Sequence, residues 1–153
     1  MLQIINNDIW KFWENDATIV VPTNGFVKND GSCVMGRGLA KQAIQRVYNM
    51  QFILGSMIKA HGNVPFYFDH VNIITFPVKH NWWEKADLEL IKKSACKLRA
   101  EIETEWTDVP IPIYMPKVGC GNGQLDWKDV EPIIETLLKD IVLIVDNGKG
   151  SSE

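Results

Sequence analysis

The sequence lacks several features that mark secreted, metal-stabilised and membrane-spanning proteins. Its only cysteines are Cys33, Cys96 and Cys120, an odd set without the paired spacing of metal ligands, so neither a disulfide framework nor a metal site is expected. No apolar run approaches the roughly 20 residues that cross a bilayer, and the first residues lack the apolar core of a signal peptide. These absences predict a soluble, cytoplasmic protein that does not bind a membrane.

The chain also lacks an excess of either charge. Its formal net charge is −3, and its 16 basic and 19 acidic residues are scattered rather than grouped. Proteins that bind nucleic acid through its phosphates cluster their lysines and arginines, so a strong nucleic-acid surface is not expected here. An anionic ligand would have to be held by backbone N–H groups and a few local cations.

What the sequence does have is enough apolar residues for one core. Of its 153 residues 46% are hydrophobic, and it contains no internal repeat, low-complexity block or linker, which predicts a single domain over residues 1–146. Residues 147–153 have no apolar anchor and are expected to be disordered. No long apolar helix face is left over once the core is assigned, so a monomer is expected.

Strand-like and helix-like segments alternate along the chain. Several of the strand-like segments are continuous apolar runs, which are typical of a sheet covered on both faces, and the helix-like segments carry apolar residues at spacings of three and four. The predicted strands are 2–5, 18–21, 64–68, 71–78, 111–115 and 141–145, and the predicted helices are 39–48, 52–60, 86–106 and 127–139. This alternation predicts an α/β domain with three layers.

Two glycine-rich segments each precede a predicted helix. Residues 116–124 read Pro-Lys-Val-Gly-Cys-Gly-Asn-Gly-Gln, and residues 35–40 read Met-Gly-Arg-Gly-Leu-Ala. Glycines cost conformational entropy unless the backbone must approach something closely, and free N–H groups at a helix start favour an anion. Two such loops predict a clamp on a diphosphate, with Arg37 and Lys117 as the nearest cations. The alternative for 35–40 is a tight helix start with Arg37 in water.

Two polar residues near predicted strand ends each have two possible roles. Ligands of α/β sheets lie beyond the carboxyl ends of strands, so the Asn24 amide could bind a sugar hydroxyl, or Thr23-Asn24-Gly25 could be a simple turn. Asp8 could accept a hydrogen bond from the amine of a base, or it could cap a short helix over 9–14. The local sequence favours the turn and the cap.

Cys120 lies within the second glycine-rich segment, and Asp126 follows it. Asp126 could act as a base, although Asp129 three residues later gives it the pattern of a helix cap, which is the favoured interpretation. Cys120 lies between two glycines and could have a lowered pKa. No histidine lies near it in the sequence, which favours an unreactive thiol.

The strand predicted at 71–78 ends in an unusual group of side chains. Lys79 or His80 could bind a phosphate or transfer a proton. Trp82 and Trp83 follow directly and could line a ligand pocket, although packing across the start of the next helix is the favoured interpretation.

The order of these segments resembles the macrodomain superfamily. The segments that carry the resemblance are 7–9 (Asn-Asp-Ile), 23–25 (Thr-Asn-Gly), 35–40 and 116–127. The nearest branch comprises the terminal ADP-ribose protein glycohydrolases and the antitoxin macrodomain that removes ADP-ribose from DNA. Residues 76–83 are also similar to small bacterial and phage macrodomains, and the likeness spans nearly the whole chain.

This resemblance implies a three-layer α/β/α sandwich with a mixed, mostly parallel six-stranded sheet that holds ADP-ribose at the strand ends. Asp8 and the Ile9 amide would hold the adenine, and Asn24 would approach the distal ribose. The two glycine loops would enclose the diphosphate through Gly36, Arg37, Gly38, Leu39, Gly119, Cys120, Gly121, Asn122 and Gly123. The implied partner is ADP-ribose or an ADP-ribosylated macromolecule, with no further cofactor.

The resemblance leaves two classes of function open. Glycohydrolases of this branch use a lysine in the helix after the first loop and an aspartate inside the second. Here that helix has only Lys41, about one turn earlier, and Gly123 stands in place of the aspartate. A hydrolase of ADP-ribosyl linkages or of ADP-ribose-1″-phosphate would then depend on Asn24, Asp126 and His80. The alternative is a reader that binds ADP-ribose without cleaving it.

Overall fold

The computed structural model describes residues 2–147, in which six strands and five α-helices alternate. The strands are β1 (Ile4–Asn6), β2 (Ile19–Asn24), β3 (Phe66–Phe68), β4 (Ile73–Lys79), β5 (Ile113–Met115) and β6 (Val142–Asp146). The helices are α1 (Ile9–Trp13), α2 (Gly38–Arg46), α3 (Met50–His61), α4 (Leu88–Thr104) and α5 (Trp127–Leu138), with a short 3₁₀ turn η1 (Gly121–Gly123). Each predicted strand and helix is present. The tail predicted to be disordered lies, apart from Asn147, outside the described residues.

The six strands form one mixed sheet in the order β1-β6-β5-β2-β4-β3. The pairs β1–β6, β5–β6, β2–β5 and β2–β4 are parallel, and only the edge strand β3 runs antiparallel to its neighbour. Parallel neighbours require crossover connections, which the helices supply. The prediction of a mostly parallel six-stranded sheet is confirmed.

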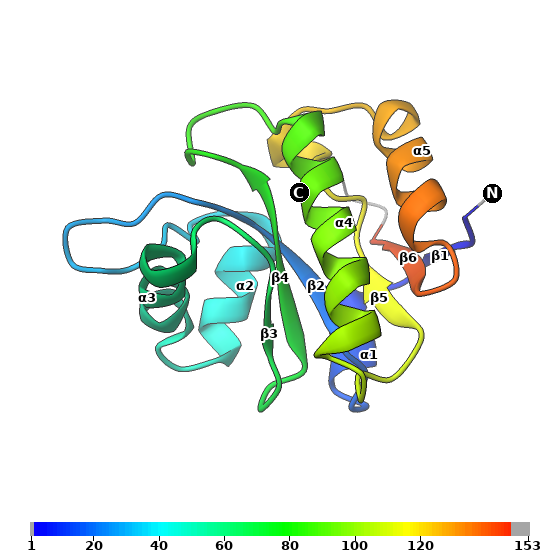
Figure 1. Cartoon of the computed structure of the whole chain (residues 1–153), viewed down its shortest axis with the longest axis horizontal. Coiled ribbons are helices and arrows are strands. Elements are labelled where there is room, and N and C mark those ends of the chain that lie inside the picture. Colours follow the sequence, from blue (N-terminus) through cyan, green and yellow to red (C-terminus); the bar gives the residue numbers. More distant parts are fainter. Residues whose placement is uncertain (1, 148–153) are drawn as a thin grey trace.

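The sheet is the middle of three layers (Figure 1). Helices α4 and α5 cover one face, where residues such as Ile91 and Ile134 pack with Val20 of β2. Helices α1, α2 and α3 cover the other face, where Ile19 and Val21 are buried. Neighbouring residues of a strand point to opposite faces, so the continuous apolar run of β2 is the direct consequence of burial on both sides.

Several element boundaries differ from the predicted ones for local reasons. Strands β3 and β5 begin at Phe66 and Ile113, one residue after Pro65 and Pro112, because proline has no N–H to donate to a sheet. Helix α4 begins two residues later than predicted because the Asp87 side chain caps it, accepting from the Glu89 N–H at 2.9 Å.

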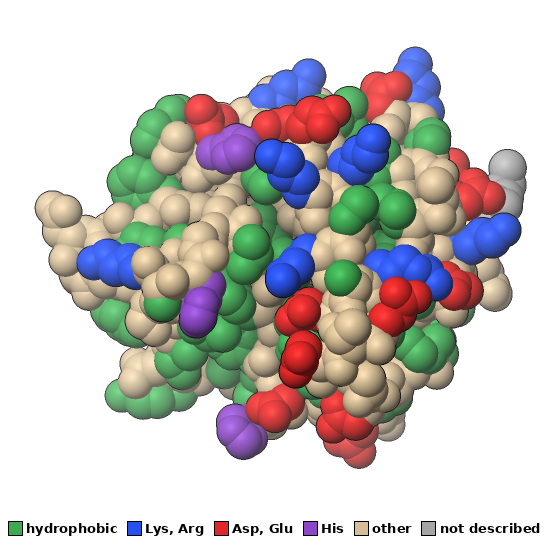
Figure 2. Space-filling view, viewed as in Figure 1, with side chains coloured by type: hydrophobic (Ala, Val, Ile, Leu, Met, Phe, Trp, Pro, Cys, Tyr) green, Lys and Arg blue, Asp and Glu red, His purple; other side chains and the backbone are tan. Residues whose placement is uncertain are grey.

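No helix within residues 2–147 is long and apolar enough to cross a membrane. The same residues contain no group of three or more His, Cys, Asp or Glu side chains placed to hold a metal ion. On the face that carries α4, basic and acidic side chains are intermixed (Figure 2). The two pockets described below lie instead at the carboxyl ends of the parallel strands.

Candidate functional site

The sequence segments singled out above meet where β2, β4, β5 and β6 end, which is the edge at which α/β sheets hold ligands. Two pockets of about 360 and 340 Å³ open there. The Asp8 pocket is lined by residues that include Asp8, Trp10, Leu39, Gln42, Arg46 and Pro116. The Lys79 pocket is lined by residues that include Thr23, Asn24, Arg37, Lys79, Trp82 and Asn122. The first glycine loop contributes to both pockets and therefore lies between them.

Asp8 forms one wall of the Asp8 pocket and caps helix α1 at the same time. One of its carboxylate oxygens, Oδ1, accepts a hydrogen bond from the Trp10 N–H at 3.0 Å. The Asn7 side chain in turn accepts from the Asp8 N–H at 2.8 Å. The cap predicted for Asp8 is confirmed, and a carboxylate has further lone pairs with which to accept from a ligand.

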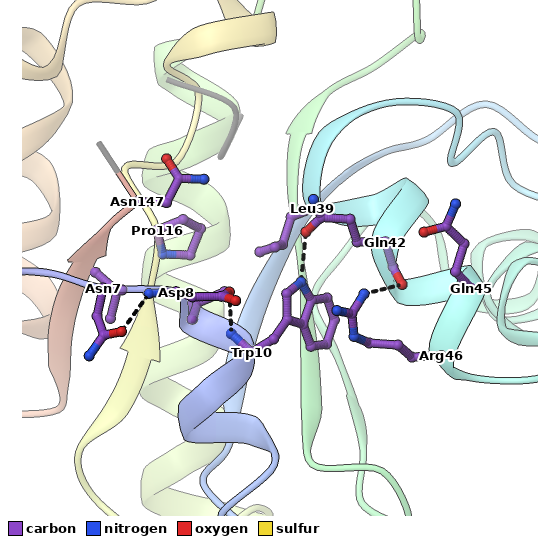
Figure 3. Close-up of a pocket in the computed structure, with 11 residues that line it drawn as sticks. Asn7, Asp8, Trp10, Leu39, Gln42, Gln45, Arg46, Pro116 and Asn147 are labelled. Atoms are coloured by element: carbon purple, nitrogen blue, oxygen red, sulfur yellow. Dashed lines mark hydrogen bonds between the residues drawn. The ribbon is translucent and has the colours of Figure 1, made fainter. Parts of the chain in front are cut away.

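Trp10, Gln42 and Arg46 form a contact between α1 and α2 in the same pocket (Figure 3). The Trp10 indole N–H donates to Gln42 Oε1 at 2.7 Å. The guanidinium carbon of Arg46 lies 4.2 Å from the centre of the Trp10 ring, a favourable cation–π arrangement. This contact joins residues about 30 positions apart in the sequence and holds the α1 and α2 walls together.

The Lys79 pocket is strongly basic. Lys28, Arg37 and Lys79 line it, and no Asp, Glu or His is among its lining residues in the described part of the chain. The Lys79 amino group donates to the main-chain oxygens of Asn122 at 3.3 Å and Trp82 at 3.5 Å. Three cations and no carboxylate in the lining of the pocket favour an anionic ligand.

A β-bulge sets the position of Lys79. Along the β2–β4 pair, Thr23 lies opposite Pro77, but the next residue, Asn24, lies opposite Lys79 rather than Val78. The extra residue, Val78, interrupts the regular alternation of side chains, and such bulges re-aim the residues that follow them. The bulge therefore places Lys79 directly across from Asn24 at the ends of the two strands.

Asn24 is the last residue of β2, and its side chain bonds to the main chain two residues on, as in an Asx-turn, so the turn favoured by the local sequence lies at the end of the strand. Its Nδ2 donates to the Val34 main-chain oxygen at 2.9 Å, and its Oδ1 accepts from the Phe26 N–H at 2.9 Å. These bonds fold the following segment back over the strand end. The Cys33 thiol also donates to Oδ1 at 3.8 Å. The second N–H of the carboxamide is the group with which Asn24 can bind a ligand in the pocket that it lines.

The glycines of the two loops serve different needs. Gly119 and Gly121 have φ of +78° and +71°, the region that side chains disfavour, and a Cβ on Gly119 would lie 2.7 Å from the Ile91 side chain. A Cβ on Gly36, by contrast, would meet no atom within 4 Å. The second loop thus needs glycine for its own fold, whereas Gly36 leaves open space in the Lys79 pocket.

The thiols and the other loop cation are poorly suited to chemistry. Burial raises the pKa of Cys120 to about 11 and that of Cys33 to about 12, so neither is a thiolate near neutral pH. The unreactive interpretation of Cys120 is supported, and a lowered pKa is contradicted. Lys117 is paired with Asp146 at 3.1 Å and lies over the Trp127 ring.

His80 and Asp126 are not among the residues that line the two pockets. His80 pairs with Asp87 at 2.8 Å at the start of α4, and its hydrogen bond is the main cause that lowers the pKa of the Asp87 carboxyl. Asp126 accepts from the Lys128 N–H at 3.2 Å and caps α5 as predicted. The structure therefore brings Asn24 together with Lys79, not with His80 or Asp126.

The sequence identified Lys79 as a residue that could bind a phosphate or transfer a proton, and it gave no indication of Gln42 or Arg46. The signal for Lys79 was its place at the carboxyl end of a buried strand. Gln42 and Arg46 carry no comparable signal, because their contacts with Trp10 depend on how α1 packs against α2.

Neither a protein-family model nor a curated protein sequence matches the chain. Solved structures do. The macrodomain of Mycobacterium tuberculosis DarG is similar with a TM-score of 0.70 and 25% identity, and that of Thermus aquaticus DarG with 0.71 and 23%; each comparison covers 95% of this chain and 97% of the other. Thermosipho africanus DarTG in complex with ADP-ribose has a TM-score of 0.63 and 21% identity, over 84% of this chain and 37% of that chain. The chain therefore has the macrodomain fold.

Proposed function

We propose that this chain binds ADP-ribose across the two pockets and hydrolyses the bond between the distal ribose and the group attached to it. The adenosine occupies the Asp8 pocket, the diphosphate lies between the two glycine loops, and the distal ribose enters the Lys79 pocket. The similar DarTG structure contains ADP-ribose. The two pockets, separated by the loop at the start of α2, match a ligand with a nucleoside at one end, a ribose at the other and an anionic centre.

The diphosphate site rests on backbone and charge. Helix α2 begins at Gly38, directly after Gly36 and Arg37, and the N–H groups of a first helical turn attract anions. Gly38 and Gly121 both have positive φ, and successive N–H groups in such conformations form anion-binding concavities. Arg37 lines the neighbouring pocket and adds a charge-assisted donor.

The observation that carries the hydrolytic proposal is the position of Lys79. Its amino group lies between the end of β4 and the second glycine loop, and it donates to two main-chain oxygens. Hydrolysis breaks the bond from C1″ of the distal ribose to the leaving group; the hydroxyl of water joins C1″, and its proton ends on the leaving group. The Lys79 ammonium stabilises the negative charge that develops on the leaving group. Asn24, opposite Lys79 in the sheet, positions the ribose.

A second substrate is favoured by the three cations of the Lys79 pocket. ADP-ribose-1″-phosphate carries a further anion at the position that this pocket would enclose, and Lys28, Arg37 and Lys79 line it. The same charges suit other anionic leaving groups. The binding-only alternative, a reader of ADP-ribose, uses the same pockets without turnover.

The test combines binding with product release. The protein is titrated with ADP-ribose by calorimetry and incubated with ADP-ribosylated protein, ADP-ribosylated DNA and ADP-ribose-1″-phosphate, while released ADP-ribose and phosphate are quantified. Binding with release from at least one substrate is the expected result. Binding without any release supports the reader, and absence of ADP-ribose binding contradicts the proposal as a whole.

A further inference from the structure

We propose that Gln42 is a specificity-determining residue of the Asp8 pocket, and that its side-chain amide donates a hydrogen bond to an acceptor atom of the adenosine of ADP-ribose. The inference rests on the ADP-ribose binding proposed above. Gln42 lies on α2 and faces the pocket from the side opposite Asp8 (Figure 3). It is half-buried, so its amide is held at the pocket wall rather than free in water.

The orientation of the Gln42 amide follows from the chemistry of its partner. An indole N–H is a donor and has no lone pair to offer, so the Gln42 atom 2.7 Å from Trp10 Nε1 must be the carbonyl oxygen. The two ends of an amide group point in different directions. Oε1 accepts from Trp10 and keeps one further lone pair, whereas the NH₂ end carries two donors, so we assign the contact with the ligand to the NH₂ end. Gln42 therefore presents a donor to the pocket.

Trp10 is itself fixed by packing within the protein, which also fixes the orientation of the Gln42 amide. Trp10 is only 2% exposed and packs edge-on against Trp13 at 5.1 Å between ring centres. Arg46 covers its ring and also donates to the main-chain oxygen of Gln42 at 3.2 Å. A donor held in place before binding loses little entropy when the ligand arrives.

The two walls of the pocket are chemically complementary to adenosine. Asp8 offers carboxylate lone pairs, which match the amine of adenine. Gln42 offers N–H groups, which match a ring nitrogen or a ribose oxygen on the other side of the nucleoside. In a nucleoside with a carbonyl in place of the amine, the carbonyl oxygen would lie against the Asp8 carboxylate. Both groups accept hydrogen bonds and neither donates one, so such a nucleoside should bind poorly.

The experiment measures ADP-ribose affinity by calorimetry for the full chain, four single variants and one double variant. Gln42→Glu keeps an oxygen for Trp10 but replaces the NH₂ by an acceptor, and we expect an affinity loss of about tenfold or more. Gln42→Met removes the donor without adding charge and is also expected to lower the affinity. If Gln42→Glu does not fold, the affinity of Gln42→Met alone tests the role of the Gln42 amide. Lys41→Gln is the charge control: it changes the net charge by the same amount on the neighbouring position outside the pocket, and about unchanged affinity is expected.

Trp10→Phe tests the link between the two side chains. It removes the indole N–H and frees the Gln42 amide to rotate, so the affinity for ADP-ribose should fall a few-fold in the wild-type background. In the Gln42→Met background the same substitution should not change the affinity, because Trp10 acts through Gln42. Equal losses in both backgrounds, or Gln42→Glu and Gln42→Met binding as wild type does, would overturn the inference. These outcomes differ from failure of the proposed function, in which the wild-type chain does not bind ADP-ribose.

ADP-ribose analogues that lack the ring nitrogen N3, the ring nitrogen N7 or the 2′-hydroxyl identify the acceptor that Gln42 contacts. The wild-type chain should bind the analogue without this acceptor more weakly than ADP-ribose, whereas Gln42→Met should bind the two with equal affinity.

Discussion

The side-chain nitrogen of Lys79 lies 3.3 Å from the main-chain oxygen of Asn122. This contact joins the end of β4 to the second glycine loop, two segments that are 43 positions apart. The Lys79 cation therefore belongs to strand β4 and at the same time contacts the second glycine loop. In the proposed binding mode, the Lys79 cation faces the distal end of the ADP-ribose molecule that the two loops hold.

Replacing Lys79 should separate catalysis from binding. Lys79→Met keeps the apolar stem and removes the charge, so turnover should fall by about 10²–10³, while ADP-ribose affinity should change by less than about tenfold. Steady-state release of ADP-ribose and calorimetry measure the two quantities. Lys85→Met, an exposed position that does not line either pocket, is the control. Equal loss of turnover in both variants would remove Lys79 from the mechanism.

Asp8 should contribute separately to binding and to stability. Asp8→Ala should weaken ADP-ribose binding by about 1–3 kcal/mol through the lost hydrogen bond and lower the unfolding free energy by about 1 kcal/mol through the lost cap of α1. Asp8→Asn can still cap the helix, so it should retain stability and lose part of the affinity. Thermal melts with calorimetry distinguish the two effects. If Asp8→Ala binds as tightly as wild type, Asp8 is only a cap.

The two glycine loops should respond differently to added side chains. Gly36→Val adds atoms to open space, so the melting temperature should stay within about 3 °C of wild type, while the bulk obstructs the ligand and weakens ADP-ribose binding by about tenfold or more. Gly119→Ala meets the Ile91 side chain at 2.7 Å with φ of +78° and should instead destabilise the fold. Comparison of melting temperature and affinity in the two variants is the measurement. Retained affinity in Gly36→Val would place the ligand away from this loop.

The His80–Asp87 pair should affect stability with pH rather than catalysis. His80 holds the pKa of the Asp87 carboxyl below its ordinary value. A lowered folded-state pKa gives stability that is present above the ordinary carboxylate range and is lost as the pH falls through the folded pKa. His80→Ala should therefore unfold more easily than wild type at pH 7, and the difference should shrink below about pH 3. Denaturant unfolding at both pH values tests this, and a difference that persists in acid would contradict it.

The same variant decides whether His80 takes part in chemistry. Because His80 does not line either pocket, turnover by His80→Ala should stay within about twofold of wild type at neutral pH. A loss as large as that of Lys79→Met would restore His80 as a catalytic candidate.

Most of the fold could be predicted from the sequence because burial leaves a local pattern. The apolar run at 18–21 and the helical spacing at 127–139 report which residues are covered, whatever covers them. Asp126 with Asp129 likewise identified the start of α5, since a cap is a contact within one turn. Boundaries were less predictable where proline or a cap intervened, as at Pro65 and Asp87.

The site was less predictable because its key contacts are not local. The bulge that aligns Lys79 with Asn24 exists only in the pairing of β2 with β4, and nothing in the sequence of either strand marks it. The contact of Trp10 with Gln42 spans 32 positions and depends on the packing of α1 against α2. Local patterns predicted the turn at Asn24 but not the extension of β2 to that residue, beyond the predicted end at Val21.

Titration of ADP-ribose into the isotopically labelled protein, followed by NMR, tests the central claim most directly. We predict saturable binding at one site, with the largest shift changes at Asp8, Lys79 and the glycine loops 36–39 and 119–123. We also predict that the same titration of Asp8→Asn requires more ligand to reach saturation. No shift changes on titration, or changes confined to residues outside the two pockets, would contradict the account.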